Sequence, residues 1–287
     1  MLFKDLLFLI ERYLQKNNIT EYDKNDLYRL INYIFKIDIN SLYLKDYEIN
    51  VSNYKLNKLK KCLISYYINF VPIAYITKSQ NFYNENYYIN ENVLVPRYDT
   101  EVLVETAIKY IEKYNLKKCI DMCTGSGCVG ISIAKNSSID EMKLVDISSE
   151  AIKVVKRNVK LNNIGNKCKT VCSDLFNNIS KNDKFSLLVA NPPYIKLKDK
   201  KILSKYVKNE PEIALFGGND GMDFYKRILD NAAYYLENNA FIIFEIGYDE
   251  KEDIKNLISN YKFYDIIEFI KDYGNNDRVV VCHFHQI

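Results

Sequence analysis

The stretch at residues 121–130, which reads DMCTGSGCVG, decides the fold class. It follows a short apolar segment and leads into a helical one, and its glycines at 125, 127 and 130 satisfy the pattern G-x-G-x-x-G. Glycines let a backbone pass close to a ligand, and the N-terminus of the following helix presents free N–H groups with a partial positive charge. A dinucleotide phosphate and the amino-acid carboxylate of S-adenosylmethionine suit such a loop equally well, so the motif alone leaves both open.

Outward from this loop, strand and helix segments alternate. Predicted strands lie at 119–122, 143–146, 170–173, 186–190 and 241–246, and predicted helices at 99–114, after Gly127, at 149–161 and at 223–236. Such nearly continuous apolar strands are typical of a parallel sheet covered by helices on both faces. Residues 265–270 and 278–284 are joined by turn-rich residues, so they should pair as an antiparallel hairpin at one edge. We predict an α/β fold with a doubly wound, seven-stranded, mostly parallel sheet.

Two acidic residues follow the next two strands. Asp146 lies nineteen residues past Gly127, where an acidic side chain can accept hydrogen bonds from both ribose hydroxyls. Asp174 follows the third strand, where an adenine amino group would find an acceptor. The alternative is a tight strand-to-helix turn with aspartates that cap helices. The glycine-rich loop is followed in order by Asp146 and Asp174, and this order favours a nucleotide-type cofactor.

The fourth strand, 186–190, runs directly into a tetrad of residues, Asn191-Pro192-Pro193-Tyr194. The tetrad lies at the edge where open α/β sheets place their ligands. The prolines stiffen the turn and leave carbonyl acceptors without matching donors. An amide or aryl-amine nitrogen is a poor nucleophile because its lone pair is delocalised. If the Asn191 side-chain oxygen and the Pro192 carbonyl each accept one N–H, the lone pair can face a methyl donor, while Tyr194 stacks on the planar group. The alternative is a rigid strand-ending turn.

Composition excludes several classes of protein. The 40 basic and 37 acidic residues give a net charge of +3, far from a dedicated nucleic-acid binder. Seven scattered cysteines without a C-x-x-C spacing argue against disulfides and zinc, and the N-terminus lacks the features of a signal peptide. No apolar run approaches 18 residues. We expect a cytoplasmic protein without a membrane segment.

The first 72 residues differ from the rest of the chain in their pattern of apolar residues. Apolar residues recur there at helical spacing, with Asn/Asp-rich breaks near 17–26 and 37–41. We predict a small helical domain at 1–72, which we expect to dock the substrate, and a β-hairpin linker at 73–95, with the hairpin itself at 82–95. The domain at 96–287 should then be catalytic.

Taken together, the chain from Pro72 onward resembles the HemK/PrmC family of protein-glutamine methyltransferases. The resemblance rests on Pro96–Glu101 (PRYDTE), Cys123–Gly127, Asn191–Tyr194, Glu210-Pro211, Ala214–Gly218, Asp220-Gly221, Glu245–Gly247 and Asp277-Arg278. It implies a Rossmann-like methyltransferase domain that uses S-adenosylmethionine to methylate the glutamine of the Gly-Gly-Gln motif in peptide-chain release factors. Cys123 stands where the family usually has Gly, and Tyr98 where Pro is common.

The resemblance also implies roles for particular residues. Asn191, Pro192 and Tyr194 are expected to be catalytic, and Asn191, Pro192, Pro193 and Tyr194 to bind the substrate glutamine. The expected cofactor contacts are Cys123, Thr124, Gly125, Ser126, Gly127, Asp146, Asp174, Leu175 and Asn191. No metal is needed, because the methyl donor carries its own leaving group. His283 and His285, with no third ligand signalled nearby, are interpreted as strand residues that face one side.

Other functions compete with this interpretation. A DNA or RNA adenine methyltransferase could use the same tetrad on an exocyclic amine after base flipping, but residues 1–70 carry 11 basic and 8 acidic residues, too balanced to grip phosphates. Stable nucleic-acid binding is therefore not expected. A ribosomal-protein glutamine is a second possible substrate. A dehydrogenase has only the glycine pattern in its favour and leaves the tetrad unexplained.

Overall fold

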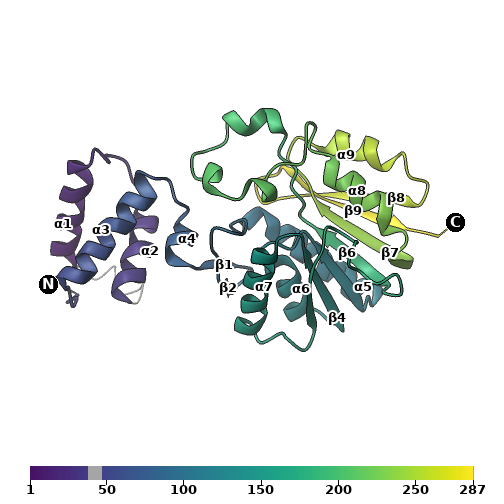
Figure 1. The fold of residues 1–287 in the computed structure, drawn as a ribbon, viewed down its shortest axis with the longest axis horizontal. Helices are drawn as coiled ribbons and strands as arrows, with labels where there is room; N and C mark the ends of the chain where they lie inside the picture. Colours follow the sequence, from purple (N-terminus) through teal and green to yellow (C-terminus); the bar gives the residue numbers. More distant parts are fainter. Residues whose placement is uncertain (38–46, 287) are drawn as a thin grey trace. The chain divides into compact units, whose positions relative to one another are not determined.

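The computed structural model describes residues 1–37 and 47–286, and the chain divides into two compact units (Figure 1). The first unit comprises Met1–Lys78 together with Lys205–Asn209, and the second comprises Ser79–Ser204 and Glu210–Ile287. The helical unit thus extends past residue 72. No helix in the described part of the chain is both long and apolar enough to cross a membrane.

The first unit is helical. Its helices are α1 (Phe3–Lys16), α2 (Lys24–Phe35), α3 (Asn53–Tyr67) and α4 (Ile73–Thr77). Side chains of Asp23 and Ser52 accept hydrogen bonds from backbone N–H groups at the starts of α2 and α3, which satisfies donors that a helix leaves free. The break predicted at 37–41 lies, apart from Ile37, outside the described residues.

The segment Lys205–Asn209 joins this unit from far along the chain. The Asn209 side chain donates to the carbonyls of Asn69 and Phe70, at 3.1 and 2.9 Å. The ring of Tyr206 lies 5.0 Å from that of Tyr66 and 5.5 Å from that of Phe70. Polar and aromatic contacts therefore hold this segment against the end of α3.

The hairpin predicted at 82–95 is real but shorter and earlier. Strands β1 (Gln80–Phe82) and β2 (Glu85–Tyr87) pair antiparallel through a turn at Tyr83 and Asn84, which both have positive φ, 49° and 60°. Two such residues make the turn that suits a two-residue hairpin loop. Pairing stops at Tyr87 because the next residue, Tyr88, instead bonds with the Asn158 side chain through its N–H and its carbonyl, at 2.7 and 2.9 Å.

The second unit contains the predicted sheet. Its strands, in sheet order, are β5 (Cys168–Cys172), β4 (Glu141–Asp146), β3 (Lys118–Met122), β6 (Phe185–Ala190), β7 (Leu236–Glu245), β9 (Asp277–Phe284) and β8 (Tyr264–Lys271). The first five run parallel, and β9 is antiparallel to both β7 and β8. The seven-stranded, mostly parallel sheet with an edge hairpin is confirmed.

Helices cover both faces of this sheet (Figure 1). They are α5 (Glu101–Tyr114), α6 (Cys128–Asn136), α7 (Ser149–Leu161), α8 (Asp223–Ala232) and α9 (Lys251–Ile258). Helix α6 packs between α5 and α7, while α8 packs with α9. The predicted helix at 223–236 was too long, because the chain turns after Ala232, with the Tyr235 N–H bonded to the Ala232 carbonyl at 2.8 Å, and enters β7 at once.

The register of the parallel strands places four loops at one edge. Met122 pairs with Val145 and with Ala190, and Asp146 pairs with Cys172. The strands β3, β4, β5 and β6 therefore end at about the same level, and the chain leaves each of them on the same side of the sheet. The glycine loop, Cys123–Gly127, and the tetrad are thus neighbours although about 65 residues separate them.

Candidate active site

An open cavity lies at this edge, within the second unit. Predicted cofactor residues that line it are Cys123, Thr124, Gly125, Ser126, Asp146, Asp174, Leu175 and Asn191. Pro193 lines it as well, whereas Gly127, Pro192 and Tyr194 do not. The cavity is therefore continuous from the glycine loop to the first residue of the tetrad.

The glycine loop turns tightly through left-handed conformations. Cys123, Gly125 and Gly127 have φ values of 60°, 55° and 83°. A Cβ built on Gly125 would meet nothing within 4 Å, so the backbone there faces open space. A Cβ on Gly127 would lie 3.0 Å from Ile131, so this glycine allows the loop to pack on α6 and does not face the cavity. Cys123 tolerates its left-handed turn despite its side chain.

Two carboxylates hold the glycine loop in place through hydrogen bonds. Asp121 Oδ2 accepts from the Thr124 hydroxyl at 2.5 Å and from the Gly130 N–H at 3.0 Å. Asp146 accepts from the N–H groups of Gly125 and Ser148, at 2.8 and 2.9 Å. Burial raises the pKa of Asp121 to about 7 and also raises that of Asp146. The role of Asp121 was missed from the sequence, although a charged residue within an apolar strand was a usable signal.

Asp174 has a protein partner that the sequence did not reveal. Both its carboxylate oxygens accept from Arg227 of α8, at 2.7 and 2.8 Å. Arg227 and Phe224 of the same helix also line the cavity. Sequence reasoning missed both, because they lie some 50 residues beyond Asp174 in a helix that carries no motif. The expected adenine acceptor is thus already engaged by a guanidinium.

The tetrad is anchored by polar side chains of other elements. Asn191 Nδ2 donates to the hydroxyl of Thr100, at 3.3 Å, and Thr100 is 3% exposed. The Thr100 side chain also interacts with the Glu245 carboxylate, which in turn accepts from the Tyr194 hydroxyl at 3.3 Å. A chain of polar contacts therefore runs from Asn191 through Thr100 and Glu245 to Tyr194. Thr100 belongs to the quoted PRYDTE segment, but its partner could not be inferred from spacing.

Two glycines let a distant loop pack against the tetrad backbone. A Cβ on Gly217 would lie 2.4 Å from the carbonyl oxygen of Pro193, and one on Gly221 would lie 2.5 Å from that of Tyr194. The Ile195 N–H donates to the Leu215 carbonyl at 2.9 Å. The loop at 214–221, which carries motifs of the family resemblance, therefore packs against the backbone of the tetrad.

A buried glutamate holds two residues that line the cavity. Glu210 is 4% exposed and accepts from the Val95 N–H at 2.9 Å and from the Arg97 guanidinium. Arg97 and Pro96 both line the cavity. The contact explains why the Pro96–Glu101 and Glu210-Pro211 segments belong to one site although they are far apart in the sequence.

Glu245 should make the folded state sensitive to pH. It is 2% exposed, and burial raises its pKa to about 7. A carboxyl group whose pKa is raised by folding stabilises the fold below its unfolded pKa, and this stability is lost as pH rises through the folded pKa. We expect Glu245→Gln to remove about 1 kcal/mol of the stability loss between pH 6 and pH 8, measured by urea unfolding. Exposed Glu237→Gln is the control, and equal pH slopes for wild type and Glu245→Gln would contradict the prediction.

His283 and His285 do not line this cavity. The sequence signalled no third ligand near them, but in the structure Asp265 lies close to both. Asp265 of β8 is directly opposite His283 in register, and one possible ligand atom from each of the three residues lies within 4.8 Å of the others. Asp265 could have been found only by aligning the two strands of the hairpin.

Comparisons with known proteins agree with this fold. The family described as "Methyltransferase small domain" matches residues 98–219. Among solved structures, the ribosomal protein L11 methylase of Lactobacillus delbrueckii subsp. bulgaricus has a TM-score of 0.50 at 17% identity over 69% of this chain and 84% of that one. The hMettl16 catalytic domain, solved with an RNA hairpin, has a TM-score of 0.58 at 13% identity over 93% of each chain. The matched domain and the fold identify a methyltransferase with a Rossmann-like domain.

Relatives identified by sequence show which family of methyltransferases the chain resembles. The release factor glutamine methyltransferase of Clostridium acetobutylicum is 38% identical over 98% of both chains. Those of Fusobacterium nucleatum and Mycoplasma mycoides are 34% and 32% identical, covering 94% and 93% of this chain and 75% and 94% of their own lengths. This chain belongs to the release factor glutamine methyltransferase family.

Proposed function

We propose that the protein transfers a methyl group from S-adenosylmethionine to the side-chain amide nitrogen of the glutamine in the Gly-Gly-Gln motif of peptide-chain release factors. The observation that carries the proposal is the single cavity shared by the glycine loop and Asn191. A donor held at one end and an acceptor amide held at the other would meet there. The names of the relatives support the release factor as the substrate.

The residues at the glycine end suit S-adenosylmethionine. The buried hydroxyl of Ser126 has no hydrogen-bond partner among the described residues, and the backbone at Gly125 faces open space. We assign the loop Cys123–Ser126 to the amino-acid end of the cofactor and Asp146 to its ribose hydroxyls. Leu175 would offer apolar surface to the adenine. When bound, the cofactor supplies an electrophilic methyl group on a sulfonium.

Asn191 and Pro192 would orient the substrate amide. Asn191 donates an NH₂ hydrogen to the Thr100 hydroxyl oxygen, which fixes the Asn191 NH₂ group on the Thr100 side. The Asn191 oxygen is then free to accept one N–H of the glutamine, and the Pro192 carbonyl can accept the other. Two fixed acceptors turn the nitrogen lone pair toward the donor, and the proton that becomes acidic as the N–C bond forms can leave to water.

Tyr194 would act differently from the expectation of a stacking platform. Its hydroxyl bonds to buried Glu245, and its ring packs against the core and does not line the cavity. We assign it to anchoring the turn, so that the Asn191 and Pro192 oxygens keep their direction.

The cellular setting follows from the substrate. Release factors act on ribosomes, so we place the reaction in the cytoplasm, in translation termination. The helical unit, with its balanced charge, would dock the protein substrate and not a nucleic acid.

One experiment tests the function. The protein is incubated with isotopically labelled S-adenosylmethionine and a purified bacterial release factor, and the modified residue is located by mass spectrometry. We expect one methyl group on the glutamine of Gly-Gly-Gln, and none on a release factor with that glutamine changed to alanine. Transfer to a ribosomal protein or to DNA or RNA, with none to the release factor, would refute the substrate assignment.

Thr100→Val should slow methyl transfer without weakening donor binding. Valine keeps the shape but removes the oxygen that fixes the Asn191 amide, so we expect kcat to fall by about 10-fold. The Thr100 side chain does not cap α5, and urea unfolding of this variant and of Thr100→Ser checks that the fold is retained. Thr100→Ser retains the hydroxyl and should keep most of the rate. Equal kcat values for the valine and serine variants would exclude this positioning role.

A further inference from the structure

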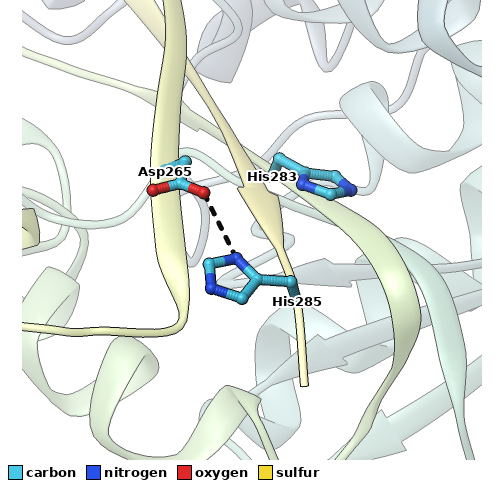
Figure 2. Close-up of side chains that lie close together, drawn as sticks. All are labelled: Asp265, His283 and His285. Atoms are coloured by element: carbon cyan, nitrogen blue, oxygen red, sulfur yellow. Dashed lines mark ion pairs between the residues drawn. The ribbon is translucent and has the colours of Figure 1, made fainter. Parts of the chain in front are cut away.

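The edge hairpin brings the only two histidines of the chain together with an aspartate. His283 lies in β9, His285 follows the end of that strand, and Asp265 lies opposite His283 in β8. Residues two apart on a strand share a face, and directly paired residues share it across strands. Figure 2 shows the Asp265 carboxylate facing the His285 ring, whereas the His283 ring points away from this pair.

The distances suit a bound metal ion. Asp265 Oδ2 and His285 Nδ1 are 3.2 Å apart, and ligand atoms of all three residues lie within 4.8 Å of one another. A metal about 2.1 Å from both atoms of the closer pair would make an angle of about 100°, near the tetrahedral value. His283 is only partly buried, and its side chain would have to rotate to bring a ring nitrogen to the same point.

The backbone around the cluster is fixed. The His285 N–H donates to the Phe263 carbonyl at 3.0 Å, which holds the residue beside the start of β8 although it lies beyond β9. Strand pairing fixes His283 against Phe241 on its other side. The ligands therefore come from a preformed hairpin, so metal binding would order few side chains.

The cluster is separate from the methyl-transfer cavity. His283 pairs with Phe241, which pairs with Leu187 near the start of β6, whereas the tetrad follows Ala190 at the end of that strand. None of the three residues lines the cavity. A metal here would not reach the reacting groups.

We propose that Asp265, His283 and His285 form a binding site for a divalent transition metal, with Zn²⁺ as the preferred ion. Two imidazoles and one carboxylate are ligands that zinc accepts in tetrahedral sites, with water in the fourth position. Mg²⁺ and Ca²⁺ prefer sets made only of oxygen. The bound ion would clamp β8 to the end of β9 and so stabilise the sheet edge.

The test is a titration of the metal-free full-length protein with Zn²⁺ alone. We expect one Zn²⁺ per chain by calorimetry and a higher unfolding temperature, with no effect of Mg²⁺. His285→Asn and Asp265→Asn should each weaken Zn²⁺ binding by ~10-fold or more. Because His285 is outside the strands and Asp265 is exposed, both variants should fold, and their unfolding temperatures without metal should match the wild type.

Thiols are the competing zinc ligands, and Cys172 is the exposed cysteine. Cys172→Ser is therefore the matched control and should bind Zn²⁺ as the wild type does. Co²⁺ bound to the wild type should show no thiolate-to-metal absorption. Unchanged binding in the His285→Asn and Asp265→Asn variants, loss of binding in Cys172→Ser, or no stoichiometric binding to the wild type would overturn the proposal. Methyl transfer should be the same in all these variants.

Discussion

Asn191→Ala is expected to lower kcat for methyl transfer by about 10²- to 10³-fold while leaving the affinity for the methyl donor nearly unchanged. Alanine removes one of the two oxygens that would accept the glutamine N–H groups, so the amide rotates and its lone pair is no longer directed at the donor. The donor keeps its contacts with the glycine loop and Asp146. Single-turnover rates and calorimetry with S-adenosylhomocysteine measure the two effects separately.

The control for this variant is Asn136→Ala. Asn136 is exposed at the end of α6, and its side chain donates to the Ser132 carbonyl of the same helix, at 2.9 Å. Its loss should leave kcat within about 2-fold of wild type. If Asn191→Ala methylated the release factor as fast as Asn136→Ala does, Asn191 would have no part in orienting the substrate.

Asp146→Ala should chiefly weaken donor binding, by about 100-fold in Kd. The variant loses acceptors for the ribose hydroxyls, each hydrogen bond to a charged group contributing about 1.5–3 kcal/mol. It also leaves the N–H groups of Gly125 and Ser148 without their carboxylate partner, so the glycine loop should loosen. At saturating donor, kcat should recover to within about 10-fold of wild type, because the tetrad is intact.

Exposed Asp140, which lies before β4, provides the matched control, and Asp140→Ala should bind S-adenosylhomocysteine like the wild type. A Kd for Asp146→Ala that stayed within about 3-fold of the control would place the ribose elsewhere.

The sequence was sufficient for the fold where its periodicity was long and strong. Buried strands such as 186–190 and helix 149–161 were predicted within a residue of their observed ends. Helix α9 was missed because it is short and buries only Ile254 and Ile258 among charged residues. The hairpin at 80–87 was misplaced because its end depends on Asn158, far along the chain.

In the candidate site, too, local sequence patterns were predictable, whereas contacts between distant elements were not. The glycine loop, Asp146 and the tetrad follow strands directly, so local sequence and the strand-edge rule were enough to bring them together. Thr100, Arg227 and Glu245 act through contacts between elements that are distant in sequence, and no spacing encodes such contacts. The cluster of Asp265, His283 and His285 was overlooked for the same reason, since Asp265 meets His283 only across a strand pair.

The most direct measurement is a structure of the protein with S-adenosylhomocysteine and a peptide that contains Gly-Gly-Gln. The account predicts the glutamine amide nitrogen within hydrogen-bond distance of both the Asn191 Oδ1 atom and the Pro192 carbonyl oxygen, with the cofactor sulfur on its open side. A glutamine bound away from these two oxygens, or a cofactor bound outside the cavity that Gly125 and Asn191 share, would contradict it.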